Sequence, residues 1–421
     1  FTFFAVKILF AQNLEADYIF KNVNIITMKD DKVLPNKTIV IKGGKILEIS
    51  DKTKYKSNNT INAKGKYLMP TMADAHVHLP QNNEELEKVM KLNLINGVTK
   101  LRSMRGDWND VNRRIKYTYE KDYYPRLYLS PAPIHRSHEL SVADLETYVK
   151  ASKDNGFDFI KILSIKNQSM LKQLDSICKK YDVKIAGHYP EDANGVSFPD
   201  DMVFSTNYKT FEHLGGLIGE SEHFENRVKK MKQNNIFVCP TMQWFAIGYG
   251  QYGVDEMLNQ KGMEYIPTEI KKDWAEKSKN YREKLGKEAF EQEKNKYAIE
   301  MQERLNATKR LNDEGVKLLL SPDSSSKFIV PGFGMLEEMK LYKKANISNF
   351  DILKSATTNF AMLFNENYGT IETGKNADFI LLSQNPLQDI KALENIDAVF
   401  YNKFYLDKKQ LNEIAKSILP K

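Results

Sequence analysis

Residues 67–78 read YLMPTMADAHVH, an apolar run that ends in two histidines separated by one residue. Side chains alternate between the two faces of a β-strand, so His76 and His78 would point the same way if this run is a strand. Their imidazoles would then be close enough to bind one metal ion. In another conformation they would be ordinary surface or core histidines, and the motif alone does not separate the two interpretations. The decision depends on what the rest of the chain places beside them.

The composition is that of a globular protein large enough for two or three ordinary domains, or for one barrel with an accessory domain. Of its 421 residues, 41% are hydrophobic and 28% are charged, and no apolar run reaches the length of a membrane span. The net charge of +7 comes from 62 basic and 55 acidic residues. Because no block of basic residues with interleaved aromatic residues occurs, we expect no nucleic-acid partner.

The two cysteines, Cys178 and Cys239, have no paired spacing and are predicted to be buried thiols. Residues 1–12, FTFFAVKILFAQ, are apolar except for Lys7. They resemble the end of a secretory signal peptide with Ala11 at a cleavage position, which predicts a periplasmic or secreted protein. An ordinary N-terminal strand of a cytoplasmic protein is the alternative. We expect no membrane association once a signal peptide is removed.

Beyond residue 78 the sequence alternates between strand-like and helix-like segments, the pattern of a parallel sheet with crossover helices. Eight strand-like runs occur, at residues 67–78, 98–102, 126–130, 159–163, 184–188, 210–213, 236–240 and 318–323. Eight strands make a (β/α)8 TIM barrel, in which active sites lie at the carboxyl ends of the strands. The predicted fold class is therefore α/β.

Strand-like sequence also occurs at both ends of the chain, in residues 18–26, 38–49 and 60–69 and again after residue 368. We expect residues 13–68 and 366–421 to fold together as a small discontinuous β-sandwich domain. The barrel would then comprise residues 69–365.

An unusually long segment, residues 241–317, separates the seventh and eighth predicted strands. It is rich in Lys, Glu and Gln and is helix-like from residue 268 to 314. Its position favours a lid over the barrel mouth, whereas its charge favours a solvated helical insertion. Both interpretations stay open.

Polar residues recur where the predicted strands end. His188 ends the fifth strand, His213 the sixth and Asp323 the eighth. Each has an ordinary explanation alone, as a hydrogen-bonded histidine or a helix-capping aspartate. Together with His76 and His78 they would converge on one barrel mouth and offer nitrogen and oxygen ligands suited to zinc-like divalent ions.

Lys161 lies within FIKIL, the otherwise apolar fourth strand, where burial of an unpaired ammonium group is costly. An ion pair, or a side chain that extends to the surface, would be the ordinary explanation.

These features resemble the amidohydrolase superfamily of metal-dependent hydrolases along nearly the whole chain. The matching stretches are PTMADAHVH (70–78), GVT (97–99), GFDFIKI (156–162), EH (212–213), SPD (321–323), ATTNFA (356–361) and GTIETGKNAD (369–378). They are most similar to the imidazolonepropionase-like and prolidase-like branch, in its binuclear subtype.

The resemblance implies two divalent metal ions, for which zinc is expected. His76, His78 and Asp323 would bind the more buried ion, and His188 and His213 the more exposed one.

Lys161 matches the position that in the binuclear subtype reacts with carbon dioxide to form a carbamate bridging both ions. The nucleophile would be a hydroxide bridging the two ions. Asp323 would accept the proton of the water and deliver it to the leaving group.

Three further residues near the predicted site are candidate substrate contacts. Arg102, at the end of the second strand, and His135, beyond the third, would meet a carboxylate or carbonyl of the substrate. A surface salt bridge and a loop histidine are the alternatives. Tyr189 follows His188 directly and is either a polar contact or part of the pocket wall.

The expected activity is hydrolysis of an amide bond in a small molecule such as a dipeptide or an N-acyl amino acid. Hydrolysis of a cyclic amide, a lactone or a phosphotriester is an alternative, because the same hydroxide attacks each of these centres. A non-catalytic barrel scaffold is less favoured because all six ligand positions are filled, and a deaminase is less favoured because Lys161 implies a bridged metal pair. A homo-oligomer is compatible with the sequence.

Overall fold

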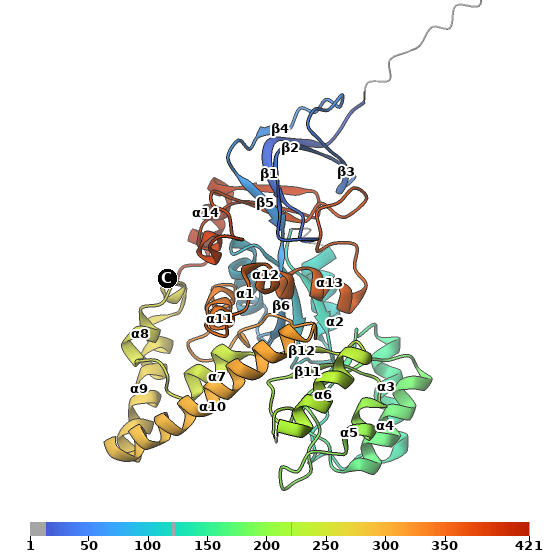
Figure 1. The fold of residues 1–421 in the computed structure, drawn as a ribbon, viewed down its shortest axis with the longest axis vertical. Helices are drawn as coiled ribbons and strands as arrows, with labels where there is room; N and C mark the ends of the chain where they lie inside the picture. Colours follow the sequence, from blue (N-terminus) through green and yellow to red (C-terminus); the bar gives the residue numbers. More distant parts are fainter. Residues whose placement is uncertain (1–13, 120–122, 220, 421) are drawn as a thin grey trace, which may run out of the picture.

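The computed structural model of the protein describes residues 14–119, 123–219 and 221–420 (Figure 1). The predicted signal segment, residues 1–12, lies outside these residues. Within them, no helix is both long enough and apolar enough to cross a bilayer. A mixed sheet lies at one end of the molecule, and parallel strands surrounded by helices form the larger part (Figure 1).

The N-terminal and C-terminal segments share the mixed sheet, in the order β15-β14-β13-β5-β1-β2-β3, with β4 paired to β1. The strands are β1 (Tyr18–Ile26), β2 (Val33–Lys42), β3 (Lys45–Ser50), β4 (Thr60–Asn62), β5 (Tyr67–Pro70), β13 (Phe379–Leu382), β14 (Ile396–Tyr401) and β15 (Phe404–Asp407). A sandwich would have two separate sheets, whereas these strands form one hydrogen-bonded sheet. Strands β1 and β14 are not neighbours in it, yet the rings of Phe20 and Phe400 lie 6.0 Å apart. The sheet therefore curls over a single apolar core.

The predicted strand 67–78 is wrong as one element, because the structure divides it into β5 and β6 (Met72–Val77), which belong to different sheets. Between them, the amide of Thr71 donates to the carbonyl of Asp378, and the amide of Met72 donates to that of Gly97. The chain thus passes from the mixed sheet to the parallel strands at Thr71. The six residues of β6, including His76, are all buried.

The parallel strands form two hydrogen-bonded groups, β6-β7-β8 and β12-β11-β10-β9. Their bounds are β7 (Val98–Ser103), β8 (Arg126–Leu129), β9 (Ile160–Ile162), β10 (Ile185–Gly187), β11 (Tyr208–Glu212) and β12 (Phe237–Cys239). The predicted eighth strand, 318–323, is not a continuous strand, but it connects the two groups. The amide of Leu319 donates to the carbonyl of Val238 in β12 (2.8 Å), and the amide of Ala75 in β6 donates to that of Leu320 (3.1 Å).

Two hydrogen bonds join the groups on the other side, where the amide of Asp158 donates to the carbonyl of Leu129 and the amide of Ile134 to that of Lys161. The arrangement is a TIM-barrel-like α/β fold, as the sequence predicts. The predicted sandwich is wrong, because the terminal strands form one curled sheet, whereas closure into a complete (β/α)8 barrel and the domain limits stay predictions.

Helices surround the parallel strands. They are α1 (Asn83–Ile95), α2 (Asp110–Arg114), α3 (Val142–Asp154), α4 (Gln168–Lys180), α5 (Asp200–Phe204), α6 (Ser221–Gln233), α7 (Met242–Gly248), α11 (Gly334–Lys344), α12 (Asn349–Ala356) and α13 (Thr358–Phe364), with short helical turns η1 (Ile115–Tyr119), η2 (Met263–Tyr265) and η3 (Ile390–Glu394). The last helix, α14 (Lys408–Ser417), packs instead against α1 and against β14 and β15 of the mixed sheet. Helix α4 is representative: Asn167 caps its first turn, and Leu171, Leu174 and Cys178 are buried on one face. Both cysteines are free buried thiols, as predicted.

The long segment after β12 contains α8 (Val254–Leu258), α9 (Thr268–Leu285) and α10 (Lys287–Asp313). The expected helix-like run 268–314 is thus interrupted at Gly286, which has a left-handed backbone (φ 84°). Helix α9 has no buried residue, whereas α10 buries residues from Met301 onward. Figure 1 shows α9 and the start of α10 projecting from the parallel strands. Much of this part is solvated, although Trp274 of α9 packs on Phe328 with ring centroids 5.3 Å apart, and the second half of α10 packs against α7 and α11.

Candidate metal centre

Six residues from five different strands or strand-like runs meet where the parallel strands end. They are His76 and His78 at the end of β6, Lys161 in β9, His188 after β10, His213 after β11, and Asp323 after the connecting run 318–322. The ring centroid of His213 lies 4.5 Å from that of His76 and 4.9 Å from that of His188. The structure thus brings together all six predicted ligands.

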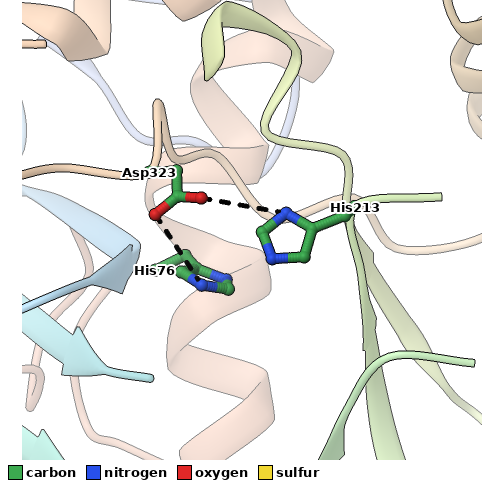
Figure 2. A group of neighbouring side chains, drawn as sticks. All are labelled: His76, His213 and Asp323. Carbon is green, nitrogen blue, oxygen red and sulfur yellow. Dashed lines mark ion pairs between the residues drawn. The ribbon is translucent and has the colours of Figure 1, made fainter. Parts of the chain in front are cut away.

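Asp323 lies between the histidines (Figure 2). Its Oδ1 is 3.4 Å from His78 Nε2 and 3.9 Å from His76 Nε2, and its Oδ2 is 3.9 Å from His213 Nδ1. Distances of 3.9 Å are too long for hydrogen bonds. Ligand atoms about 2 Å from one ion lie about 3–4 Å from each other, so this spacing suits a shared cation.

Several buried polar atoms of the centre have no hydrogen-bond partner among the described residues. They are His78 Nε2, His188 Nε2 and Asp323 Oδ1. An unpartnered buried polar atom costs about 1–3 kcal/mol. Since divalent cations would satisfy imidazole nitrogens and a carboxylate oxygen together, these residues fit metal ions of the zinc class.

Burial keeps the imidazoles neutral. It lowers the pKa of His78 and His188 to about 4, with the nearby Lys161 adding to both shifts. Burial also holds the pKa of His76 and His213 well below the usual value. A neutral imidazole is the form that binds a metal, so all four are ready to coordinate at neutral pH.

The pKa values of Lys161 and Asp323 are shifted in opposite directions, because burial disfavours the charged form of each group, a cation in Lys161 and an anion in Asp323. Lys161 is 3% exposed, its Nζ lies 3.4 Å from His76 Nε2, and burial lowers its pKa. Burial raises the pKa of the Asp323 carboxyl, and the charge of Lys161 partly offsets this. Each group therefore loses its charge more readily here than it does in water.

Glu212, one residue before His213, holds His76 in place. Its Oε2 lies 2.9 Å from His76 Nδ1, and its Oε1 accepts hydrogen bonds from Arg102 (3.0 Å) and Thr210 (2.6 Å). With Nδ1 donating to Glu212, the Nε2 of His76 is the nitrogen that faces the centre. Sequence reasoning missed this role, although a carboxylate inside a buried strand is itself a signal that a partner is needed.

Arg102 lies elsewhere than expected for a substrate contact. It is 1% exposed, and its guanidinium donates to Glu212, to Thr210 and to the carbonyl of Ala75. It also lies 4.6 Å from the ring of Phe159. Its position is that of a partner of the Glu212 carboxylate, and it offers no exposed surface to a substrate.

The other two candidate substrate contacts also have protein partners. His135 lies in a half-buried loop, where its Nδ1 is 2.7 Å from the Oγ of Ser137. Tyr189 is 2% exposed, and its hydroxyl donates to Asp200 at 2.6 Å. Its ring packs against Phe204 and Phe211, so a role of Tyr189 in substrate binding stays a prediction.

The backbone at the ends of the strands is unusual. His213, Thr241 and Asp323 have left-handed φ values of 69°, 50° and 66°, a strained conformation for residues with side chains. Two contacts hold His213: its Nδ1 lies 2.6 Å from the Oγ1 of Thr241, and Arg304 of α10 donates to its carbonyl. The insertion thus reaches the site through Arg304, which the sequence did not indicate.

Gly187, immediately before His188, packs against β9 so closely that only glycine fits. Its φ is 141°, and a Cβ there would lie 2.0 Å from the carbonyl oxygen of Ile162. We expect Gly187→Ala to lower the free energy of unfolding by on the order of 3 kcal/mol, because β10 must move away from β9. Urea denaturation measures this. Gly195→Ala, at a left-handed position with open space, is the control and should cost about 1–2 kcal/mol. Equal losses would contradict the steric argument.

Comparison with known proteins places this geometry in a family. The model of the amidohydrolase family matches residues 67–403, which include all six residues of the centre. The chain belongs to the amidohydrolase family. This confirms the resemblance found in the sequence.

Solved structures of similar fold align with this amidohydrolase over nearly its whole chain. One is a Xaa-Pro dipeptidase with bound methionine, which is 18% identical, has a TM-score of 0.68, and aligns over 93% of this chain and 99% of its own. Another is the bottromycin amidohydrolase, which is 17% identical, has a TM-score of 0.72, and aligns over 95% and 89%. At these identities the likeness concerns the fold.

A more local sequence match is to 5'-deoxyadenosine deaminase of Methanosarcina acetivorans, 45% identical over 64 residues. The match spans only 15% of this chain and 15% of the relative. It adds a deaminase to the relatives of this amidohydrolase, and it leaves most of both chains unmatched.

Proposed function

We propose that the protein is a binuclear metal-dependent hydrolase that cleaves an amide bond of a small peptide-like substrate, such as a dipeptide or an N-acyl amino acid. The observation that carries the proposal is the position of Lys161, buried in β9 with its Nζ 3.4 Å from His76 Nε2. An ammonium ion at this place would repel any cation bound by the histidines. A lysine is compatible with bound cations among these ligands if its amino group is converted to an anion.

Reaction with carbon dioxide makes that conversion. The neutral amine of Lys161 forms a bond to the carbon atom of carbon dioxide and releases one proton, which leaves a carbamate with one negative charge and two oxygens. This group would bind both ions, between the His76 and His78 pair and the His188 and His213 pair. Two zinc-class ions, when bound, would polarise the amide carbonyl and lower the pKa of water.

The protein side chains carry out the remaining functions. Asp323, whose Oδ1 has no hydrogen-bond partner among the residues that the structure describes, would accept the proton of the attacking water and deliver it to the leaving amine. The neutral imidazoles hold the ions, and Glu212 orients His76 through Nδ1. Family membership and the dipeptidase among the solved relatives support hydrolysis of a carbon–nitrogen bond.

Deamination of an adenine nucleoside is the second candidate, favoured by the local match to 5'-deoxyadenosine deaminase. The position of Lys161 favours amide hydrolysis, because a carbamate implies two ions. Hydrolysis of a cyclic amide, lactone or phosphotriester uses the same ligands and differs only in the substrate.

Zinc-loaded protein assayed against dipeptides, N-acyl amino acids, lactones and 5'-deoxyadenosine tests the proposal. We expect release of the amine from an amide substrate, two ions per chain by elemental analysis, and a carbamate signal in ¹³C NMR after labelling with ¹³C-bicarbonate. Lys161→Met should lose the signal and one ion. Lys100→Met, a second buried lysine that pairs with Asp378 at 2.7 Å, should keep both ions. Ammonia release from 5'-deoxyadenosine without amide cleavage would overturn the proposal.

Metal removal should destabilise the protein, because the neutral imidazoles and Asp323 lose their partners. A metal present at 100 times its Kd contributes about 2.7 kcal/mol for each site. We therefore expect a chelator to lower the melting temperature by several degrees, as calorimetry would show. Zinc should restore it and magnesium should not, because magnesium prefers oxygen ligands. Identical melting curves before and after chelation would contradict a metal centre.

A further inference from the structure

A pocket of about 370 Å³ lies between helix α7 and the segment that follows Asp323. Its lining residues are Trp244, Ile247 and Gly248 of α7 and Ser326, Lys327 and Ile329 of the segment after Asp323. Helix α7 follows β12, and Ser326 is three residues beyond Asp323. The pocket therefore lies between two neighbouring loops at the ends of the strands where the metal ligands meet.

Trp244 links the pocket to the centre. Its ring centroid lies 6.4 Å from that of His213, and its side chain is 43% exposed. The ring packs edge-on against Phe245 at 4.9 Å, and the guanidinium of Arg304 covers Phe245 at 3.5 Å. Trp244 thus presents an exposed aromatic surface that neighbouring rings hold in place, next to the candidate metal ligand His213.

The lining combines an apolar wall with one positive charge. Trp244, Ile247 and Ile329 provide the wall, and Gly248 leaves open space, since no atom lies within 4 Å of the place where its Cβ would be. Lys327 is exposed and forms no ion pair within the described part of the chain. An apolar hollow with a free ammonium group at its side complements an apolar group that carries a carboxylate.

We propose that this pocket binds the carboxyl-terminal residue of the substrate, with an aromatic or branched aliphatic side chain against Trp244 and the free carboxylate paired with Lys327. The inference rests on the proposed amide hydrolysis and specifies its substrate class. The amide bond of such a residue would lie toward His213 and the metal centre, because Trp244 lines the pocket and its ring centroid lies 6.4 Å from that of His213. Apolar pockets of this kind discriminate substrates by about 10–200-fold.

Steady-state kinetics on Ala-Phe, Ala-Leu, Ala-Gly and Ala-Phe amide test the inference. We expect kcat/KM for Ala-Phe to exceed that for Ala-Gly by about 10-fold or more. Trp244→Ala should reduce this ratio toward one, and Trp244→Phe should retain most of it. Lys327→Met should raise KM for Ala-Phe but not for Ala-Phe amide. Lys327→Arg, which keeps the positive charge, should have a KM for Ala-Phe close to that of the wild type. Lys64→Met, the same charge change in the turn between β4 and β5, is the control and should behave as wild type.

Calorimetric titration of the zinc-loaded protein with L-phenylalanine and with glycine gives a readout that needs no turnover. If no dipeptide is cleaved but phenylalanine binds more tightly than glycine and requires Trp244 and Lys327, the pocket assignment holds and the proposed reaction fails. If dipeptides are cleaved with equal kcat/KM for Ala-Phe and Ala-Gly, or if Trp244→Ala leaves the ratio unchanged, the pocket assignment is overturned and the reaction stands. Absence of both cleavage and binding overturns both.

Discussion

Replacing Asp323 by asparagine is expected to reduce turnover by about 10²- to 10⁴-fold, the usual contribution of a positioned proton acceptor. The amide of asparagine keeps a carbonyl oxygen that can contact a cation, but its nitrogen cannot accept the proton of the attacking water. The Asp323 carboxylate lies within 3.4–3.9 Å of nitrogen atoms of three histidines, so it is near any water bound among them. Metal content by elemental analysis should stay near that of the wild type.

Asp200→Asn is the matched control for this change. Asp200 is a half-buried carboxylate, which accepts hydrogen bonds from Tyr189 and Arg227 and, among the described residues, forms no ion pair with the metal centre. Its replacement should change stability more than turnover. Full activity of Asp323→Asn with metal bound would show that another group moves the proton.

The convergence of the candidate ligands was predictable from the sequence because parallel strands place their carboxyl ends at one face. A polar residue at the end of an apolar run, as at His188 and His213, is visible in the sequence without any knowledge of the neighbouring strands. Lys161 was visible for a different reason, since a charge inside the apolar run FIKIL conflicts with burial.

What the sequence did not reveal depends on contacts between distant segments. Arg102 resembles a substrate contact because it ends a strand, but its partner is a carboxylate 110 residues away, in β11. The breaks at Thr71 and Gly286 were missed because the residues on either side continue the same strand-like or helix-like pattern. The contact of Arg304 with the His213 carbonyl is hidden within an insertion whose composition indicates only a solvated helix.

The pair of Arg102 and Glu212 leads to the second large prediction. Removing one partner of a buried ion pair leaves an uncompensated charge and costs about 3–5 kcal/mol. We expect Arg102→Met to lower the free energy of unfolding by that amount, because the Glu212 carboxylate is 1% exposed and loses the arginine that pairs with it. Urea denaturation measures the loss. Arg102→Met/Glu212→Gln should recover part of it, since the double variant carries no unpaired charge.

Metal affinity separates a positioning role of this pair from a purely structural one. If Arg102 acts through Glu212 to hold the His76 ring, Arg102→Met should weaken zinc binding by about 10–100-fold, as loss of a ligand's own hydrogen-bond partner does elsewhere. Arg113→Met breaks another buried pair, with Asp110 at 2.8 Å, and should reduce stability without changing zinc affinity. Competition titration with a chromogenic chelator measures both. Equal zinc affinity in wild type and Arg102→Met would mean that the pair stabilises the strands but does not orient His76, and that His76 is held by the geometry of β6 alone.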